Sequence, residues 1–326
     1  MIRIIRYTAK MKTEWDTFCK NSINGVFLFY RDYMDYHSDR FQDHSLLFYK
    51  GKKLIALLPC NEKTEKHDNS AEMTKILSSH DGLTFGSFIM GTHTHQSDMM
   101  DCVDALKEYC KAEEISEVRF KPVPLLLQST PAEQDVFALI YHGAKLLKSE
   151  PSIITEINGY VPNYGEKRSC RCATQSKLSF KCGVEGSDWK QYHQLLSYVL
   201  DKYHQTTPIH SLSELLLLRN RFPENIRLFA VFDEDAMVAG TVVYLYNDTV
   251  HTQYMAANEE GREKQALHFC IQKLVEYYKK DKDWLDFGTS MLNRGTELDK
   301  GLIMFKEGFK GNTVLYNHWA LKVSDK

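Results

Sequence analysis

The sequence lacks an excess of either charge. It has 41 Lys and Arg residues against 43 Asp and Glu residues, a formal net charge of −2 over 326 residues. Such a balance gives no general attraction to nucleic acid or to an anionic membrane. We therefore expect no nucleic-acid partner, while a local basic patch stays compatible with the composition.

Long hydrophobic runs and metal-type cysteine motifs are missing as well. No run approaches the roughly 18 apolar residues of a membrane span. The first 16 residues, MIRIIRYTAKMKTEWD, contain no apolar h-region, so they do not resemble a signal peptide. The eight cysteines include no C-x-x-C pair. These absences predict a cytoplasmic protein with reduced thiols, and they leave the oligomeric state open.

The chain is long enough for two domains, and its pattern repeats. With 43% hydrophobic residues over this length, two cores of roughly 150 residues each are expected. Each half contains a hairpin, a helix, a strand, a second helix and closing strands, at 45–59, 99–111, 116–122, 135–144 and 152–157, and again at 226–246, 264–280, 283–289, 302–309 and 313–323. This order predicts a duplicated α/β unit with a mixed sheet flanked by helices, divided into 1–158 and 159–326.

Two more helices are expected early in the second half. The segment 187–204 has apolar residues at 3–4 spacing after a Ser187 N-cap. The segment 211–222 begins with Ser211 and Glu214, the residues of a capping box, and Pro223 stops it.

A strand that runs into a helix at 249–269 offers an anion site. Unpaired N–H groups near Glu260-Gly261-Arg262 would suit a phosphate. Gly261 would let the backbone approach a ligand closely, and Arg262 and Lys264 would add positive charge. The alternative is an ordinary strand-to-helix turn, because the repeated glycines of a dinucleotide or P-loop motif are absent.

The motif DFGTS, residues 286–290, places polar groups at the end of a predicted strand. Ligands of open α/β folds bind at this edge of the sheet. Asp286 lies between Leu285 and Phe287, so its carboxylate faces the other side of the strand and needs a partner. A structural salt bridge or a solvent-facing position is the alternative.

The stretch WLDFGTSMLNRGTELDKGLIMFKEGFKG, residues 284–311, resembles the C-terminal signature of GNAT-type acyltransferases related to the Fem peptidyltransferases, especially their Bacteroidetes members. The matching positions are Asp286-Phe287-Gly288, Ser290, Gly295, Leu298-Asp299, Gly301-Leu302-Ile303, Lys306-Glu307 and Phe309. Segments 27–50, 78–88, 121–124 and 208–218 extend the resemblance over nearly the whole chain. It implies two tandem GNAT-like domains.

The resemblance also implies roles for a Phe-Lys pair on the last helix. In the Fem enzymes such a pair contacts the transferred group, and Phe305 and Lys306 occupy these positions here. An ammonium there would stabilise negative charge on the acyl carbonyl or on the leaving group. The alternative is a lysine whose stem packs while its amine reaches water.

This chain departs from the family pattern at two places. The acidic residue usual after the serine of DFGxS is absent, because Met291 and Leu292 stand there. The usual Phe-Gly after the last helix is interrupted by Lys310. The missing carboxylate could correspond to a lost general base, to a lost substrate contact or to the loss of catalytic activity.

The first half contains a loop, SSHDGLTFGSF at 78–88, that the resemblance assigns to acceptor binding. His80, Asp81 and Gly82 are its candidate substrate contacts, with His80 as a base or a partner of a substrate hydroxyl; a structural turn histidine is equally consistent. His93 and His95 have the spacing of a metal pair but no evident third ligand, so no metal is expected. The segment 167–181 has five basic residues and no acidic one, which suits a phosphate or a solvated face.

Together with these features, the resemblance implies an N-acyltransferase with acetyl-CoA or another acyl-CoA as co-substrate. By analogy with the Fem enzymes, the amine acceptor is expected to be a small molecule or nucleotide-sugar, such as an amino sugar, or a cell-envelope precursor. The expected cofactor contacts are Tyr254, Ala257, Asn258, Gly261, Arg262, Lys264 and Phe287. The expected catalytic residues are Lys306, Asp286 and His251, with a water relay as another route for the proton, and Ser290 and Phe305 are expected to contact the substrate.

Two alternatives keep the same fold. An aminoacyl-tRNA donor would make the protein a Fem-like peptidyltransferase, although that donor requires a broad basic surface. A non-catalytic, ligand-binding relative would explain the acidic residue missing at Met291 or Leu292.

Overall fold

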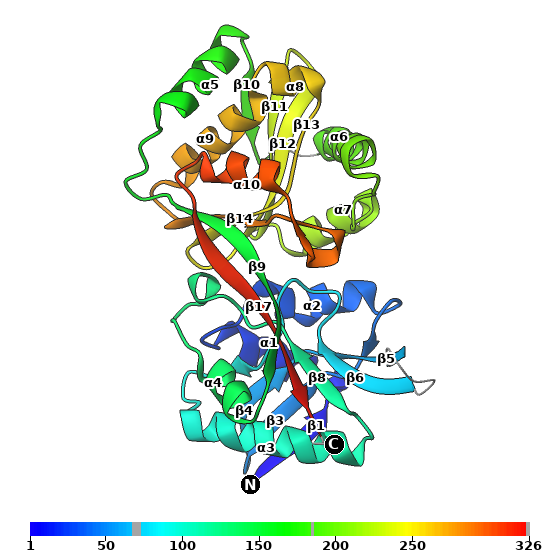
Figure 1. The fold of residues 1–326 in the computed structure, drawn as a ribbon. Coiled ribbons are helices and arrows are strands. Elements are labelled where there is room, and N and C mark those ends of the chain that lie inside the picture. Colours follow the sequence, from blue (N-terminus) through cyan, green and yellow to red (C-terminus); the bar gives the residue numbers. More distant parts are fainter. Residues whose placement is uncertain (67–72, 184–185, 324–326) are drawn as a thin grey trace. The chain divides into compact units, whose positions relative to one another are not determined.

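A computed structural model describes residues 1–66, 73–183 and 186–323. Packing divides the chain into two units, Met1–Glu150 with Leu315–Lys326 and Pro151–Val314 (Figure 1). This division lies eight residues before the boundary expected at 158. The C-terminal segment joins the first unit because the last strand pairs antiparallel with a strand of that unit, with Trp319 opposite Phe120.

The first unit has two sheets. Its helices are α1 (Lys12–Lys20), α2 (Arg31–Met34), α3 (Gln96–Ala112) and α4 (Gln134–Tyr141). Its strands are β1 (Ile2–Arg6), β2 (Gln42–Asp43), β3 (Leu46–Lys50), β4 (Lys53–Leu58), β5 (Asn61–Lys66), β6 (Met73–Ser79), β7 (Ile89–Met90), β8 (Glu117–Phe120) and parts of β9 (Lys145–Glu156) and β17 (Asn312–Lys322). One sheet has the order β1-β3-β4-β7, and β17-β8-β6-β5-β2 form the other, in which β6 and β8 are parallel.

The second unit contains α5 (Tyr164–Gln175), α6 (Ser187–His204), α7 (Leu212–Arg221), α8 (Glu259–Glu263), α9 (Ala266–Tyr278) and α10 (Lys300–Glu307). Its strands are β10 (Ser179–Cys182), β11 (Ile226–Asp233), β12 (Ala236–Leu245), β13 (Thr249–Ala257), β14 (Trp284–Thr289), β15 (Met291–Leu292), β16 (Glu297–Leu298) and the second part of β9. The sheet order is β10-β11-β12-β13-β14-β9, and only β13 and β14 are parallel in this order.

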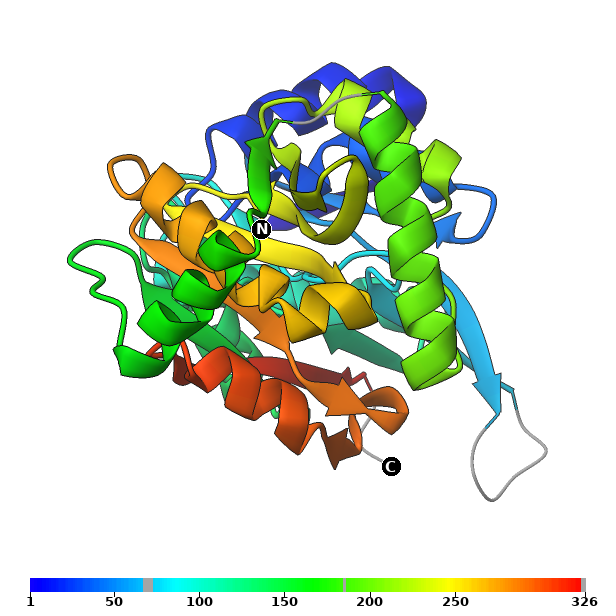
Figure 2. The ribbon, with the colours of Figure 1, turned by 90° about the horizontal axis from the view of Figure 1, so that it is seen from above.

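The helices of the second unit cover both faces of its sheet. Helix α6 packs on β12 and β13, and α9 packs on β11, β12 and β13. Figures 1 and 2 show these two helices on opposite sides of the strands. Val250, Leu285 and Phe287 join the apolar residues of α9 in one core cluster. Asp286, between the last two, therefore points to the other face, as its place in the sequence predicts.

The predicted duplication is confirmed. In each half an antiparallel hairpin leads to a strand, a crossover helix, a parallel neighbour strand and a second helix: β6-α3-β8-α4 in the first half and β13-α9-β14-α10 in the second. The capping box of Ser211 and Glu214 is present. The predicted Ser187 N-cap is wrong by one residue, because Gly186 with a φ of +60° is the N-cap and Ser187 opens α6.

All eight cysteines are free thiols. Among the described residues, no helix combines the length and the apolar character that crossing a membrane requires. In the same part of the chain, no three His, Cys, Asp or Glu side chains come together as metal ligands would, and His95 instead caps the start of α3.

Candidate functional site

The parallel strands β13 and β14 share only a short ladder. Thr249 pairs with Trp284, Val250 with Leu285 and His251 with Asp286. Within the described residues their pairing ends there, although β13 continues to Ala257 and β14 to Thr289. The yellow β13 and the orange β14 diverge toward their ends in Figure 2. Their backbone groups beyond His251 and Asp286 are therefore separated at one edge of the sheet, where an α/β fold binds ligands.

Asp286 is the centre of a buried hydrogen-bond network at this point. Its side chain has no exposed surface. One carboxylate oxygen accepts from the Ser152 hydroxyl at 2.5 Å and from the Gly288 N–H at 2.9 Å. The other lies 2.7 Å from Nδ1 of His251. The partner expected for this buried carboxylate is therefore mainly His251. Because Asp286 is itself inaccessible, it can influence a ligand only through the His251 ring.

The Asp286 carboxylate also sets the tautomer of His251. A carboxylate only accepts, so Nδ1 of His251 carries the hydrogen of the 2.7 Å contact and Nε2 keeps its lone pair. The imidazole is 5% exposed. An oriented imidazole with a free Nε2 is suited to take a proton from a nucleophile. Of the bases left open by the sequence, His251 has this arrangement.

Gly288 lies between His251 and Lys306. Its φ is +69°, and an added Cβ would stand 3.1 Å from Cε1 of His251. Its N–H holds Asp286, and its carbonyl oxygen accepts from the Lys306 amine at 2.9 Å. A glycine is required here because other residues adopt this φ at a cost and their side chain would crowd the imidazole.

Lys306 is buried and does not reach bulk water. Its side chain is 1% exposed, so the alternative of a snorkelling lysine is wrong. The amine donates to the carbonyl oxygens of Gly288 and Thr289, each at 2.9 Å. Burial lowers the pKa of Lys306 to about 8, against the opposing effects of Asp286 and Asp299. The amine remains mostly an ammonium at neutral pH, and these two contacts leave it a third N–H.

The buried ammonium predicts a pH-dependent stability difference. Between the folded pKa of about 8 and the unfolded value near 10.5, the unfolded chain binds more protons at Lys306 than the folded chain does. The free energy of unfolding of the wild type should therefore rise relative to Lys306→Met from pH 8 to pH 10.5, by about 3 kcal/mol in total. Urea denaturation of both proteins across this range measures the difference, and a constant difference would contradict the burial of the charge.

Two contacts of helix α10 fix the position of Lys306 beside Gly288. Asp299 caps the helix by accepting from the Leu302 N–H at 2.9 Å. Phe305 packs edge-on against His268, with ring centroids 4.8 Å apart. Phe287, predicted to contact the cofactor, fills the core instead and packs on Phe309. Phe305 is thus half-buried beside the lysine, whereas Phe287 supports the site from within the unit.

Three further predicted residues lie on the diverging strands or directly after them. Ser290 directly follows β14; its hydroxyl is buried and has no hydrogen-bond partner among the described residues. Tyr254 lies on β13, and its hydroxyl is 2.6 Å from Nδ1 of His210, which precedes α7. Ala257, the last residue of β13, is buried in the core. Ser290 and Tyr254 therefore belong to the same strand ends as His251 and Asp286.

The start of α8, where the sequence predicts an open anion site, already holds contacts within the protein. The side-chain oxygen of Asn258 accepts from the Gly261 N–H at 2.8 Å, and its carbonyl oxygen accepts from the Arg262 N–H. Gly261 is needed for packing, because an added Cβ would stand 2.2 Å from the Val238 carbonyl oxygen. Lys264 forms ion pairs with Asp233 and Glu260. The Gly261 and Arg262 N–H groups and the Lys264 amine are therefore engaged within the protein, so a phosphate would have to compete for them.

The loop 78–88 of the first unit has a structural role for its histidine. His80 is 2% exposed and stacks on His37 with ring centroids 5.3 Å apart. Burial lowers the pKa of His80 to about 3, and the His37 and Lys121 charges act in the same direction. The predicted base at His80 is therefore too weak and too enclosed. The Lys121 amine donates to the His80 carbonyl oxygen at 2.8 Å and also to that of Leu83, which fixes the loop.

The neighbours of His80 are more open. The Asp81 carboxylate accepts from the Ser78 hydroxyl and pairs with Lys63 at 3.0 Å. Gly82 packs against His37, where an added Cβ would stand 2.4 Å from Nε2. Asp81 thus keeps a partly exposed carboxylate, and the acceptor role of this loop stays a prediction.

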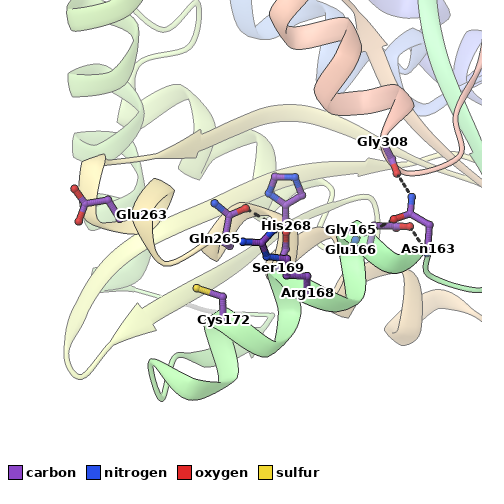
Figure 3. Close-up of a pocket in the computed structure, with 10 residues that line it drawn as sticks. All are labelled: Asn163, Gly165, Glu166, Arg168, Ser169, Cys172, Glu263, Gln265, His268 and Gly308. Carbon is purple, nitrogen blue, oxygen red and sulfur yellow. Dashed lines mark hydrogen bonds between the residues drawn. The ribbon is translucent and has the colours of Figure 1, made fainter.

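The basic segment 167–181 forms most of α5 and borders a cavity of about 540 Å³ (Figure 3). Arg168 and Ser169 line it from α5, and Gln265, His268 and Gly308 line it from α9 and the end of α10. Arg171 bonds back to its own helix. The basic residues therefore do not form one phosphate site, and the cavity reaches the ring on which Phe305 packs.

The acidic residue missing after Ser290 has a counterpart in space. Met291 and Leu292 form β15, which pairs with β16 so that Leu292 lies opposite Glu297. The Glu297 carboxylate accepts from the Asn293 amide at 2.7 Å and is exposed. Neither this carboxylate nor the Ser152 hydroxyl on Asp286 was predicted, because both contacts join residues whose pairing the sequence pattern does not specify.

Comparison with known proteins establishes the fold. No protein-family model and no curated protein matches the chain. Among solved structures, FemX is 12% identical with a TM-score of 0.69 and covers 98% of this chain and 97% of its own. A tandem GNAT protein from the clavulanic acid biosynthesis pathway is 8% identical with a TM-score of 0.55 over the full length of both chains. L-PGS from Bacillus licheniformis is 10% identical with a TM-score of 0.58, covering 86% and 85%. The prediction of two tandem GNAT-like domains is confirmed at the level of fold.

Proposed function

We propose that this tandem GNAT-fold protein is an N-acyltransferase that moves an acyl group from an acyl-CoA to an amine. One observation carries the proposal: an aspartate-oriented imidazole, His251, and a buried ammonium, Lys306, flank Gly288 at the point where β13 and β14 cease to pair. Acyl transfer to an amine requires both a proton acceptor and a positive group for the developing oxyanion.

The residues have distinct roles in this reaction. The amine nitrogen attacks the thioester carbonyl carbon and a C–N bond forms, while Nε2 of His251 takes the proton of the nucleophile. The third N–H of Lys306 stabilises the negative charge on the carbonyl oxygen until the C–S bond breaks and the thiolate leaves. Asp286 is a positioning residue that keeps Nδ1 of His251 protonated. The acyl thioester would lie along the strand ends that carry Tyr254 and Ser290.

The acceptor class rests on analogy. The FemX likeness extends over nearly the whole chain, and fold analogy supports an amino sugar or another amine-bearing cell-envelope precursor as acceptor, free or nucleotide-linked. The mechanism uses only side chains and requires no metal.

Aminoacyl-tRNA is the second candidate donor. Its support is the resemblance to the Fem peptidyltransferases, together with the FemX likeness of the fold over nearly the whole chain. A polynucleotide would bind through many phosphates at once, so its affinity should fall steeply with salt. Binding of bulk tRNA at 50 and 200 mM salt separates this donor from acyl-CoA.

The proposed reaction is tested by product analysis. The chain is incubated with acetyl-CoA and longer acyl-CoA esters against a panel of amines that includes glucosamine and a nucleotide-linked amino sugar. We expect an N-acylated product by mass spectrometry and heat on calorimetric titration of the donor. If millimolar acyl-CoA gives no N-acylated product and no heat of binding, this donor class is excluded.

A further inference from the structure

The carboxylate of Glu259 is held by an unusual number of donors. Glu259 is the first residue of α8. The Tyr198 hydroxyl lies 3.0 Å from both of its oxygens, and the Tyr203 hydroxyl lies 3.0 Å from one of them. The Lys202 amine forms an ion pair with the same oxygen. These three donors come from the last turns of α6, so one helix presents them together.

The Glu259 cluster, defined as Tyr198, Lys202, Tyr203, Glu259 and Arg262, has the composition of an anion site with its anion in place. The Arg262 guanidinium stacks on the Tyr203 ring, 3.9 Å from its centroid. The Lys202 hydrogen bond lowers the pKa of Glu259 to about 2, so the carboxylate stays charged at any physiological pH. Without the carboxylate, an ammonium, a guanidinium and two phenol hydroxyls would remain, which are donors that a phosphate accepts from.

The cluster lies at the far end of the strand that carries the reaction site. β13 runs from its ladder with β14 at His251 to Ala257, and Glu259 follows two residues later. This stretch spans about 20 Å at the rise of a strand. A cavity of about 430 Å³ adjoins the cluster and is lined by Tyr198, Asn258 and Glu259 together with residues of α6 and β12. A ligand that extends along β13 from the site would therefore end at this carboxylate.

We propose that Glu259 occupies the position of the donor's phosphate in the unliganded protein, and that a donor binds by displacing this carboxylate from Lys202, Tyr198 and Tyr203. This inference rests on the proposed acyl transfer, because it takes the ligand to be a donor with an acyl group and a phosphate at opposite ends. The displaced side chain has a solvent-facing alternative, since it is already 46% exposed. Glu259 is thus an autoinhibitory contact that lowers affinity for the donor.

Of the carboxylates near the start of α8, Glu259 is the one that pairs with Lys202. Lys264 is already neutralised by Asp233 and Glu260. Lys202 has Glu259 as its carboxylate partner, so removing this one negative charge releases the ammonium and both hydroxyls together. A charge-matched control is available on the same helix, because Glu263 is exposed and lies outside the cluster.

The test compares Glu259→Gln, Glu263→Gln and the wild type by calorimetric titration with coenzyme A and with inorganic pyrophosphate at 50 mM salt. We expect Glu259→Gln to bind both probes about tenfold more tightly than the wild type, as one released charge-assisted contact allows. Glu263→Gln should bind like the wild type. Lys202→Met should bind both probes more weakly than Glu259→Gln does, although it also frees Glu259 from its ion pair.

Each outcome separates this inference from the proposed function. Equal affinity of Glu259→Gln and the wild type, or an equal gain for Glu263→Gln, overturns the role of Glu259 while leaving acyl transfer intact. Tighter pyrophosphate binding by Glu259→Gln without any coenzyme A binding supports the role of Glu259 and removes acyl-CoA as the donor. Unchanged thermal unfolding of the exposed-site variants ensures that the affinities refer to folded protein.

Discussion

Replacing Lys306 with methionine should lower kcat about 100- to 1,000-fold while the protein stays folded. Methionine keeps most of the volume of the buried stem. It removes the third N–H of Lys306, which we propose stabilises the developing oxyanion, together with the two that donate to backbone carbonyl oxygens. The loss of one such donor in a buried site typically has this magnitude. Steady-state rates with saturating donor and acceptor measure it.

The pH profile identifies the ammonium as the active form. Because burial lowers the pKa of Lys306 to about 8, the positive charge disappears as pH rises through this value. The wild-type kcat should fall about tenfold per pH unit above pH 8. Lys306→Arg, whose guanidinium does not titrate in this range, should lose this fall if it retains activity.

Lys300→Met is the matched control for Lys306→Met. Lys300 opens the same helix and is exposed, so its replacement removes one charge without touching the buried network. We expect unchanged kcat. A Lys306→Met enzyme as fast as this control would show that the buried amine has only a structural role, and the non-catalytic alternative would then gain.

The burial of Lys306 could be predicted, but its partners could not. The apolar run 301–305 places the lysine on a helix that must pack, and the family resemblance singles out this position. Gly143 and Gly308 stand at the ends of the equivalent second helices of the two halves, so the internal repeat aligns Lys306 with Tyr141, each two residues before its glycine. Tyr141, however, is 70% exposed. Topology alone therefore does not mark the functional position. The contacts to the Gly288 and Thr289 carbonyl oxygens depend on how α10 lies across the end of β14, which periodicity does not encode.

The Asp286 network shows the same limit at longer range. Its position between Leu285 and Phe287 fixes the face of the carboxylate, and that part of the prediction is confirmed by the core. Its Ser152 partner comes from β9, 134 residues earlier, through an antiparallel pairing of β9 with β14. The first half thus supplies the strand that completes the second sheet. The boundary expected at 158 assigns each closing strand to its own half, whereas the packing division falls between Glu150 and Pro151.

The basic charge expected at the start of α8 is partly neutralised in the structure. The prediction counted Arg262 and Lys264 as free charges, whereas Asp233, Glu259 and Glu260 lie within reach of the cations at this end of the unit. In a chain with balanced charges, a local basic residue usually finds an acidic neighbour once the chain folds. A phosphate at this helix start would therefore have to displace a carboxylate, which the count of basic residues along the sequence does not reveal.

Replacing Asp286 with asparagine should lower kcat/KM by about 100- to 10,000-fold, the range seen when the carboxylate behind a catalytic histidine becomes an amide. An amide can donate to Nδ1 of His251, which moves the ring hydrogen to Nε2 and removes the lone pair that accepts the proton of the amine. The amide oxygen can still accept hydrogen bonds from the Ser152 hydroxyl and the Gly288 N–H. We therefore expect the backbone around Gly288 to keep its conformation.

A double variant separates positioning from stability. If Asp286 acts only through the imidazole, Asp286→Asn combined with His251→Ala should be no slower than His251→Ala alone, because the two residues act as a unit. Asp248→Asn, an exposed change directly before β13, should leave the rate unchanged. Multiplicative losses in the double variant would mean that Asp286 contributes independently of His251, for example by holding Gly288 in the conformation that keeps its carbonyl oxygen on Lys306. Thermal unfolding of the single variants distinguishes that case, since loss of the Gly288 contact would lower the melting temperature of Asp286→Asn but not of His251→Ala.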